Sequence, residues 1–277
     1  MSGIEAALRA SGVMRIAGVD EAGRGPCAGP LIIAAVILKD SDSPVLARVR
    51  DSKALTEKVR EELYEVVIDQ ALSYSIIEIA PEEIDRFGLH KSNLEGMRRA
   101  INSLTTPPEY VLTDGYAIEG LAIPNLAVWK GDQVALSISA ASILAKVYRD
   151  RIMREMDVKY PGYGFAKHKG YATAAHTAAL QELGITEIHR KSFANIASLI
   201  ESTGEVFNSD TAGRTPISFR ALLSIYVTSR KFDRCCRGDA SCDLFTRARR
   251  GDHRHELAHK GGRDRSSREA GRQVVVC

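Results

Sequence analysis

Long apolar runs are missing from this chain of 277 residues. The longest, PLIIAAVIL, covers Pro30–Leu38 and falls well short of the roughly 18 apolar residues that a membrane-spanning helix needs. The first residues, MSGIEAALRASG, also lack the basic segment followed by an apolar one that marks a secretory signal. We therefore expect a cytoplasmic protein with no membrane association.

Cysteine is nearly absent from the first 203 residues, where Cys27 stands alone. A single thiol excludes a disulfide framework in that part of the chain and fits a reducing compartment. The four other cysteines share the C-terminal part with three histidines, in a spacing that matches none of the usual zinc patterns. No structural zinc site is expected from these residues: Cys235, Cys236, Cys242, Cys277, His253, His255 and His259.

Neither sign of charge dominates the chain, whose formal net charge is +3. The distribution is uneven, because residues 204–277 contain 15 Lys and Arg against 9 Asp and Glu. The first 203 residues are therefore slightly acidic, so net charge alone gives no argument for nucleic-acid binding. Hydrophobic periodicity also fades after residue 203, which predicts a folded unit over 1–203 and a disordered basic tail over 204–277.

Within residues 1–203, the apolar pattern alternates between strand and helix periods. Strands are predicted at 14–22, 30–39, 73–80, 109–115 and 124–132. Helices are predicted at 55–72, 81–88, 90–104, 133–156 and 173–184. The first two strands form an antiparallel hairpin, and later strands alternate with helices, so we expect an α/β sheet of about five strands with helices on both faces.

Two common phosphate-binding motifs are also missing. The stretch GVDEAGRGPCAGP, Gly18–Pro30, is rich in glycine and contains Arg24, as phosphate loops often do. It has no Lys-Ser/Thr pair for a Walker loop, and its glycine spacing is not that of a dinucleotide fingerprint. Asp20 and Glu21 directly precede the loop, and such carboxylates repel phosphate.

Acidic residues end three of the predicted strands: Asp20 and Glu21, then Asp114 in VLTDGY, then Asp132 in VWKGDQ. Strand ends converge on a ligand-binding crevice in an α/β sheet. Oxygen ligands without nearby Cys or His select Mg2+ or Mn2+, which can bridge carboxylates to a phosphodiester. The alternative is that Asp114 and Asp132 only cap a turn and a helix. That alternative is weaker for two adjacent acids in an apolar strand.

Six segments together resemble bacterial type 2 ribonuclease H, the ribonuclease HII family, in order from Ile16 to Phe193: GVDEAGRGPCAGP, DSKALTEKVR, YVLTDG, KGD, SAASILAKVYRD and YPGYGFAKHKGYAT. The resemblance implies a ribonuclease H-like fold, in which a mixed five-stranded sheet carries helices on both faces and a small helical C-terminal extension. It implies an endoribonuclease that hydrolyses the RNA strand of RNA–DNA hybrids. It also implies cleavage on the 5′ side of single ribonucleotides in duplex DNA. We expect two-metal catalysis by Mg2+ or Mn2+ ions, and we expect the enzyme to be a monomer.

The same resemblance assigns residues. The catalytic, metal-binding acids would be Asp20, Glu21, Asp114 and Asp132. Gly23, Arg24 and Gly25 would line the ribose and sense its 2′-hydroxyl through backbone groups, and Tyr171 in HKGY would pack on the neighbouring sugar. The 2′-hydroxyl is what separates RNA from DNA at a single nucleotide, so the loop that senses it must approach closely.

Weaker expectations concern positively charged and polar residues that could contact phosphates, with a solvated surface role as the alternative. They are Lys53, Lys146, Arg149, Lys169, Arg190 and Ser192. His168 is expected to make a structural hydrogen bond, and Cys27 to be a small buried residue. Two other functions stay open: a DNA resolvase or integrase-like nuclease on the same fold, and a non-catalytic nucleic-acid-binding module with a basic tail.

Overall fold

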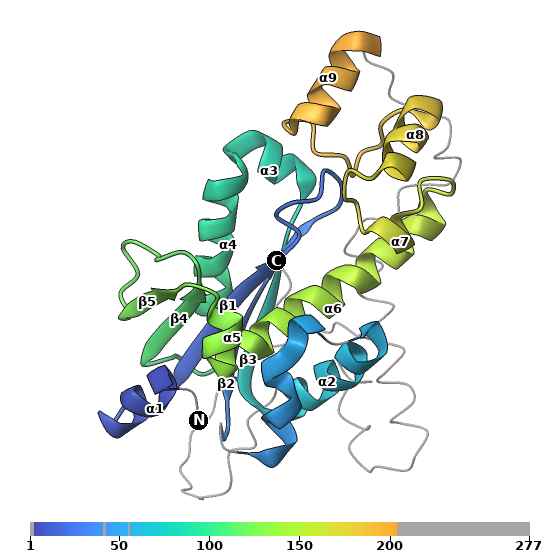
Figure 1. Ribbon diagram of the computed structural model, residues 1–277. Helices are drawn as coiled ribbons and strands as arrows, with labels where there is room; N and C mark the ends of the chain where they lie inside the picture. Colours follow the sequence, from blue (N-terminus) through green and yellow to red (C-terminus); the bar gives the residue numbers. More distant parts are fainter. Residues whose placement is uncertain (1–2, 41–42, 55, 204–277) are drawn as a thin grey trace, which may run out of the picture. The chain divides into compact units, whose positions relative to one another are not determined.

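A mixed five-stranded sheet forms the centre of the molecule (Figure 1). The computed structural model describes residues 3–40, 43–54 and 56–203, and of residues 50–54 and 203 it describes the backbone alone. Spatial strand order is β3-β2-β1-β4-β5, in which the pairs β3–β2 and β2–β1 are antiparallel and the pairs β1–β4 and β4–β5 are parallel. The strands are β1 (Ile16–Ala22), β2 (Leu31–Leu38), β3 (Ala71–Ile79), β4 (Tyr110–Asp114) and β5 (Asn125–Val128).

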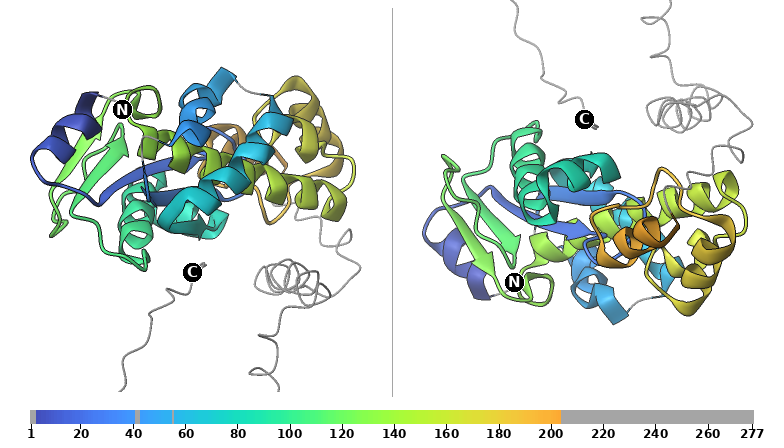
Figure 2. Two further views of the ribbon diagram at one scale, coloured as in Figure 1. Left: turned by 90° about the horizontal axis from the view of Figure 1, so that it is seen from below. Right: turned by 90° about the horizontal axis from the view of Figure 1, so that it is seen from above.

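Helices cover both faces of the sheet, so the predicted α/β architecture with a mixed sheet is confirmed. The long helix α6 (Leu136–Lys159) packs on β1 and β2, and α4 (Leu89–Asn102) packs on the same strands and β3. The remaining helices are α1 (Gly3–Ala10), the 3-10 helix η1 (Pro44–Ala54), α2 (Glu57–Gln70), α3 (Pro81–Phe87), α5 (Gly131–Val134), α7 (Phe165–His168), α8 (Ala174–Leu183) and α9 (Ala194–Thr203). Helices α7, α8 and α9 gather beyond the carboxyl-terminal end of α6, apart from α1 and β5 (Figure 2).

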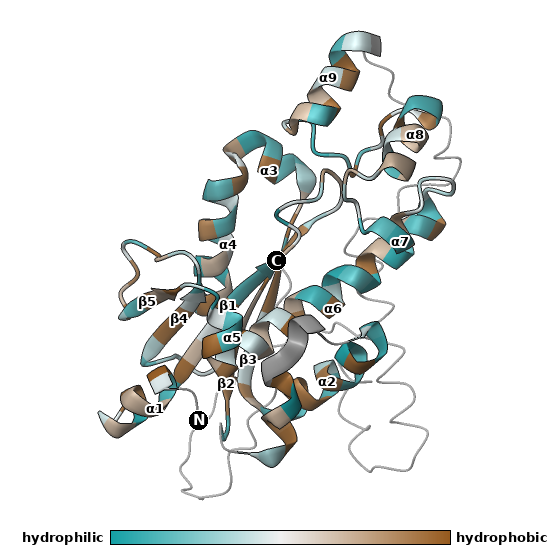
Figure 3. Cartoon of the chain, viewed as in Figure 1, coloured by the Kyte–Doolittle hydropathy of each residue, from teal (hydrophilic) through white to brown (hydrophobic). Residues whose placement is uncertain are grey.

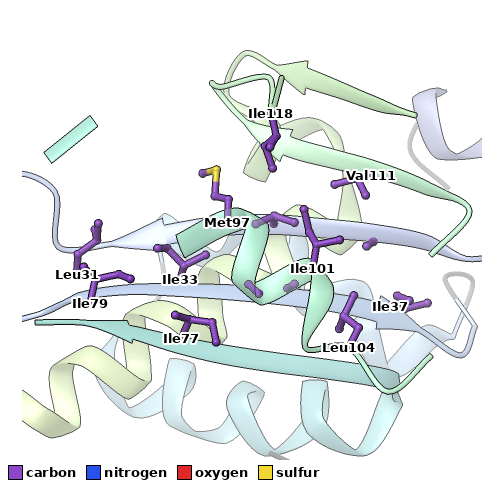
Figure 4. Close-up of a cluster of buried hydrophobic side chains, with 14 of the residues drawn as sticks. Leu31, Ile33, Ile37, Ile77, Ile79, Met97, Ile101, Leu104, Val111 and Ile118 are labelled. Atoms are coloured by element: carbon purple, nitrogen blue, oxygen red, sulfur yellow. The ribbon is translucent and has the colours of Figure 1, made fainter. Parts of the chain in front are cut away.

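Burial on both faces explains why β2 has no polar residue. All eight of its residues are buried. Successive residues of a strand point to opposite faces. Every second residue of β2, namely Leu31, Ile33, Ala35 and Ile37, lies in the hydrophobic cluster under α4. Figure 4 shows Met97 and Ile101 of α4 over Ile33. On the other face α6 approaches β1 so closely that a Cβ on Gly18 would lie 2.1 Å from the carbonyl carbon of Ser137.

Local sequence features place several helix ends where they were predicted. The hydroxyl of Thr56 accepts a hydrogen bond from the backbone N–H of Val59 and starts α2. Pro81 occupies the first turn of α3, and Gly88 follows it with φ 84°, a backbone angle that favours glycine. The apolar pattern did not predict the helices α1, η1, α5, α7 and α9, although the resemblance implied a small helical C-terminal extension.

One predicted strand end was wrong. The last strand was expected to extend to Asp132, but β5 ends at Val128. A turn follows in which Lys130 has φ 52°, and Asp132 lies in the short helix α5. The predicted tail over 204–277, with its cysteines and histidines, lies outside the described residues. In the part of the chain that the structure does describe, no helix combines the length and the apolar character needed to cross a bilayer.

Hydropathy marks the carboxyl-terminal end of β1 as unusual. The strands are largely hydrophobic, whereas the end of β1 is hydrophilic (Figure 3). This is the point at which the chain passes from a buried strand to Asp20 and Glu21 and into the glycine-rich loop. The fold therefore places charge at the carboxyl ends of the central parallel strands, where ligands bind in α/β sheets.

Candidate active site

Two neighbouring parallel strands bring three carboxylates together. In the register of β1 and β4, Val19 pairs with Thr113, so the residues that follow each of them lie side by side at the sheet end. Asp20 and Asp114 therefore meet although they are far apart in the sequence. Electrostatic repulsion links Asp114 to both Asp20 and Glu21. The predicted convergence of these three acids is what the strand register produces.

Adjacent residues of a strand point to opposite faces, and this separates the two acids of β1. Asp20 lies on the face of α6, where Ser142 interacts with it. Glu21 lies on the face of α4, where Asn93 interacts with it. The pair therefore reaches around the strand end from two sides. This explains why two consecutive acids are placed in an otherwise apolar strand.

The acids are poorly compensated. Burial, and then repulsion by Glu21 and Asp114, raises the pKa of Asp20 well above its usual value, and only 5% of this residue is exposed. Burial raises the pKa of Glu21 to about 7, although Arg24 lies 3.5 Å from it and opposes the rise. One buried oxygen of Glu21, Oε2, has no hydrogen-bond partner among the described residues. Such a site favours a bound cation.

Asp114 and Asp132 are connected through the turn between β5 and α5. Asp114 Oδ1 accepts a hydrogen bond of 2.8 Å from the backbone N–H of Gly131, the residue before Asp132. Asp132 is buried, and its backbone carbonyl accepts a hydrogen bond from the hydroxyl of Ser139. Trp129, three residues before Asp132, is 81% exposed.

The four acids do not form a closed metal cage. Across the described ranges, no three His, Cys, Asp or Glu side chains are close enough to hold an ion by themselves. The donor set still fits a hard divalent cation, since it consists of carboxylate oxygens, burial raises the pKa of Asp20 and Glu21, and Oε2 of Glu21 has no hydrogen-bond partner among the described residues. An open set of ligands leaves coordination positions for substrate and water.

A cavity of about 410 Å³ opens over the acids. Its lining comes from β1 and the glycine-rich loop, from the end of β4, and from α2, α6 and the loop after α7. The lining residues are Asp20, Glu21, Ala22, Gly23, Arg24, Gly25, Arg60, Asp114, Ser142, Ile143, Lys146, Arg149 and Tyr171. Asp132 is not among them. The cavity thus combines acidic side chains, positively charged side chains and a glycine-rich loop. This combination suits a phosphodiester bound through divalent ions.

The glycines of the loop have different reasons to be glycine. Gly23 has φ +100°, and a Cβ there would lie 2.1 Å from Nε of Arg149. Gly25 faces the other way, and a Cβ there would lie 3.1 Å from the ring of Tyr171. Tyr171 is half exposed and lines the cavity. Gly23 is therefore required by packing beneath the loop, while Gly25 leaves space at its surface.

Two arginines support the loop from within. Arg149 is buried and donates hydrogen bonds to the backbone carbonyls of Ala28, Pro30 and Lys169 at 2.9–3.0 Å. Arg190 is fully buried and donates to the carbonyl of Gly29 at 3.0 Å. Both were expected as phosphate contacts. The hydrogen bonds found for both guanidinium groups go to backbone carbonyls, while Arg149 also lines the cavity and Nη2 of Arg190 has no partner among the described residues, so contact with phosphate stays a prediction for both.

The other expected phosphate contacts differ in position. Lys146 lines the cavity and forms an ion pair of 2.5 Å with Asp150. Lys169 lies outside the lining, 3.8 Å from Glu57, and its side chain is only 12% exposed. Ser192 also lies outside and donates its hydroxyl to Asp85. The side chain of Lys53 falls outside the described residues.

Arg24 is held by a residue that sequence reasoning missed. Its Nη1 donates a hydrogen bond of 2.6 Å to the hydroxyl of Tyr116, and its guanidinium lies 4.6 Å from the centre of that ring. Tyr116 lies two residues after Asp114 in the motif VLTDGY, and this position was the only sequence feature that could have indicated its place at the site. Ser142, Asn93 and Arg60 were missed as well. Their pattern is indistinguishable from that of ordinary helix residues.

Two structural expectations are confirmed. His168 forms hydrogen bonds with local backbone, one between Nε2 and the carbonyl of Tyr163 at 2.7 Å and one from the N–H of Gly170 to Nδ1 at 3.2 Å. Cys27 is 1% exposed. Neither side chain lines the cavity.

Comparison with known proteins gives one family. The family model described as Ribonuclease HII matches residues 17–196. Ribonuclease HII of Rhodococcus opacus is 54% identical over 197 residues, which cover 71% of this chain and 87% of the relative. Ribonuclease HII of Corynebacterium jeikeium is also 54% identical, over 199 residues that cover 72% of this chain and 96% of the relative.

Solved structures agree on the fold. The crystal structure of ribonuclease H2 from Pyrococcus horikoshii matches with a TM-score of 0.63 and 29% identity, over 70% of this chain and all of that one. Bst-RNase HIII, solved in complex with Mn2+, matches with a TM-score of 0.54 and 18% identity, over 69% of this chain and 70% of that one. The second likeness concerns the fold alone.

Proposed function

The chain belongs to the ribonuclease HII family and is an endoribonuclease that acts on RNA–DNA hybrids; from this premise we propose how its cavity selects and cuts the substrate. Asp20, Glu21, Asp114 and Asp132 hold two divalent ions, Mg2+ or Mn2+. The enzyme also cuts on the 5′ side of single ribonucleotides embedded in duplex DNA. The products carry a 3′-hydroxyl and a 5′-phosphate.

The observation that carries this proposal is the coupling of three carboxylates, the buried Asp20 and the half-buried Glu21 and Asp114, in the same cavity as the glycine loop. Burial, and then repulsion from neighbouring carboxylates, raises the pKa of Asp20 and Glu21, and bound cations would relieve this repulsion. When bound, a pair of divalent ions supplies an activated water and stabilises charge on the departing 3′ oxygen. The attacking group in this chemistry is water, so no protein nucleophile is required, and His168 and Cys27 lie outside the cavity lining.

The residues of this chain position the scissile phosphate. Asp20 and Glu21 approach from the two faces of β1, and Asp114 closes the side of β4. Lys146 lies in the cavity with an ammonium group that can contact a non-bridging phosphate oxygen. Its ion pair with Asp150 keeps that group near the α6 wall.

Ribose selection falls to the loop and the tyrosine beside it. The backbone of Gly23, Arg24 and Gly25 lines the cavity and can approach a 2′-hydroxyl without an intervening Cβ at either glycine. Tyr171 exposes its ring next to Gly25, where it can pack on the adjacent sugar. Arg24 is fixed by Tyr116, which orders the loop for this contact.

Cleavage of matched duplexes tests the proposal. We expect a duplex with one ribonucleotide to be cut at its 5′ side with Mg2+ or Mn2+, an all-DNA duplex to stay intact, and a chelator to abolish cutting. End labelling identifies the 5′-phosphate. Cutting of the all-DNA duplex would instead support a resolvase or integrase-like nuclease. Binding without any cutting would support a non-catalytic module.

We also propose that the enzyme is a cytoplasmic monomer and that residues 204–277 only add salt-sensitive attraction to nucleic acid. The charge surplus of residues 204–277 can strengthen binding without adding sequence or sugar selectivity. A chain ending at residue 203 should keep its cleavage position and metal requirement. Sedimentation of the full chain, alone and with substrate, checks the monomer.

A further inference from the structure

The segment that presents Tyr171 has little regular structure of its own. Residues 169–173 lie between α7 and α8 outside any helix or strand, and the Tyr171 side chain is 51% exposed. Its backbone carbonyl points inward. It accepts one hydrogen bond from the N–H of Thr173 at 2.8 Å and lies 2.9 Å from Nδ1 of His176. The contacts of its own backbone carbonyl therefore hold Tyr171, and with it the ring, in place.

Two buried histidines continue from that carbonyl. Nε2 of His176 lies 3.0 Å from Nε2 of His189. The backbone N–H of Thr186 donates a hydrogen bond of 2.9 Å to Nδ1 of His189, and the Thr186 hydroxyl lies 2.8 Å from the same nitrogen. The chain of contacts thus starts at a backbone N–H and ends at a backbone carbonyl, with both imidazoles between them.

The fixed ends determine where each proton is. A backbone N–H can only donate, so Nδ1 of His189 accepts and its Nε2 carries the proton. That proton is donated to Nε2 of His176, whose own proton must then be on Nδ1. A carbonyl can only accept, so the Nδ1–H of His176 is donated to Tyr171. All hydrogen bonds of this histidine relay therefore run in one direction.

Both imidazoles must be neutral for the relay to exist, because a second proton on either ring would place N–H against N–H. Both residues are at most 1% exposed. Burial, followed by repulsion from His176, lowers the pKa of His189 to about 3, and burial also lowers the pKa of His176. The titratable groups facing the pair are His168, stacked on His176 at 4.4 Å, Tyr163 and the Cys27 thiol.

The relay also borders the glycine-rich loop. His189 forms an isolated β-bridge with Ala28, and the N–H of Gly29 donates a 2.8 Å hydrogen bond to the carbonyl of Ile188. The same short segment therefore touches the loop that carries Gly25 and, through the relay, the carbonyl of Tyr171. Gly25 and Tyr171 face each other across the cavity lining.

We propose that His176 and His189 are positioning residues for substrate selection: the relay fixes the carbonyl of Tyr171 and thereby sets the ring at the correct place beside Gly25 for the sugar next to a single ribonucleotide. The inference rests on the proposed role of Tyr171. The histidines touch no substrate and act through the backbone of the tyrosine. Long hybrids, which offer many equivalent positions, depend on this placement less than a single ribonucleotide does.

Two substitutions of one residue separate this role from packing. The amide nitrogen of Asn can replace Nδ1 of an imidazole, whereas the amide of Gln replaces Nε2. His176→Asn therefore keeps a donor for the Tyr171 carbonyl, and His176→Gln loses it. We expect His176→Gln to lower the ratio of kcat/KM on a single-ribonucleotide duplex to kcat/KM on a long hybrid by roughly 3- to 10-fold, the worth of one hydrogen bond. His176→Asn should keep the ratio within about twofold.

Two further variants serve as controls. Leu180→Ala removes a buried side chain from the same helix, α8, and should leave the ratio unchanged. Tyr171→Ala should lower it at least as much as His176→Gln. If Tyr171→Ala lowers the ratio and His176→Gln does not, the relay is refuted and the role of Tyr171 stands. If Tyr171→Ala has no effect, that role fails, and the relay inference fails with it. Equal effects of Asn and Gln also overturn the relay.

Nitrogen NMR of the unaltered protein provides a measurement that is independent of activity. In a sample labelled at its histidine nitrogens, we expect His176 to carry its proton on Nδ1 and His189 on Nε2. Both rings should remain neutral at mildly acidic pH. A proton on Nε2 of His176 would reverse the proposed direction and overturn the inference, even if every variant failed to fold.

Discussion

The sheet end and the region beneath the glycine loop differ in how their charged side chains are compensated. Carboxylates repel one another at the sheet end, whereas the arginines beneath the loop form hydrogen bonds with backbone carbonyls. At the sheet end, Asp20 and Glu21 repel one another and Asp114, and their pKa values are raised. Beneath the loop, burial lowers the pKa of Arg149 to about 10 and that of Arg190 to about 9, yet their guanidinium groups donate to backbone carbonyls. The first region leaves a buried carboxylate oxygen of Glu21 without a hydrogen-bond partner among the described residues, while in the second most of the guanidinium donors are satisfied by backbone carbonyls of the protein itself.

This difference assigns separate tasks to the two regions. Unrelieved repulsion among carboxylates is free energy that a divalent cation can recover on binding. Buried arginines that hold several carbonyls instead define the shape of a loop. Metal affinity should therefore be located at the sheet end and sugar selectivity in the loop region. Variants in the two regions should fail in different ways.

The largest effect is expected from neutralising an acid at the sheet end. Asp20→Asn should reduce cleavage about 10³-fold or more, because several kcal/mol of transition-state stabilisation depend on the bound metal. The stability of the metal-free protein should be unchanged or higher, since a buried charge is removed. Cleavage assays and urea unfolding measure the two effects. Asp114→Asn should behave alike, and full activity in either variant would contradict the metal assignment.

The opposite failure is expected beneath the loop. Gly23→Ala should destabilise the protein by about 3 kcal/mol, because the new Cβ meets the buried Arg149 at a positive φ. Gly25→Ala is the matched control, since its Cβ would meet only the exposed ring of Tyr171. It should cost under about 1 kcal/mol of stability and still impair single-ribonucleotide cleavage. Equal loss of stability in both variants would remove the distinction.

The pH dependence of stability tests the repulsion at the sheet end. The pKa of Glu21 is about 7 in the folded protein and 4.5 when unperturbed, so the folded state binds the proton more tightly. Its contribution to the free energy of unfolding is therefore greatest below about pH 4.5 and falls as the pH rises through about 7, by roughly 3 kcal/mol in all. Urea unfolding with a chelator measures this fall, which Glu21→Gln should reduce.

A second, half-buried acid, Glu78, gives the control. Burial and repulsion by Glu155 raise the pKa of Glu78 on β3 to about 7 as well. Glu78→Gln should also flatten the pH profile. Mg2+ should restore stability near neutral pH in Glu78→Gln but not in Glu21→Gln, because Glu78 does not line the cavity. The same response to Mg2+ in both variants would show that the metal binds elsewhere.

The smallest effect concerns the lysines near the boundary of the two regions. Lys146→Met should raise KM several-fold and lower the salt dependence of binding by about one phosphate contact. Its partly exposed ion pair with Asp150 should contribute under about 1 kcal/mol to stability. Lys169→Met should leave KM within about twofold, because Lys169 lies outside the cavity lining. A larger effect of Lys169→Met on KM would indicate that the nucleic-acid backbone passes Lys169, on the side of Glu57.

How far the sequence predicted these regions follows from the range of the interactions. The acids at the ends of β1 and β4 are local sequence features, and the parallel pairing of these strands brings them to one place. Asp132 was assigned to a strand end because nothing local marks the turn at Lys130 or the short helix α5. Asn93 and Ser142 reach the acids only through the packing of α4 and α6.

The region beneath the loop was the harder one. Arginine is almost always exposed, so the expectation that Arg149 and Arg190 contact phosphates followed the usual behaviour of the residue type. Their burial depends on tertiary structure. The carbonyls of residues 28–30, which are far away in the sequence, accept their hydrogen bonds only in the folded chain. The relay of His176 and His189 likewise depends on donors and acceptors that approach each other only in the folded chain.

Trp129 provides an intrinsic fluorescence probe close in sequence to Asp132. It is the single tryptophan of the chain, it is 81% exposed, and it lies three residues before Asp132. Indole emission changes when its contact with water changes, so titrating cations or nucleic acid into the unlabelled protein should report occupancy directly. Ligand arrival could then be timed separately from bond cleavage without attaching a dye.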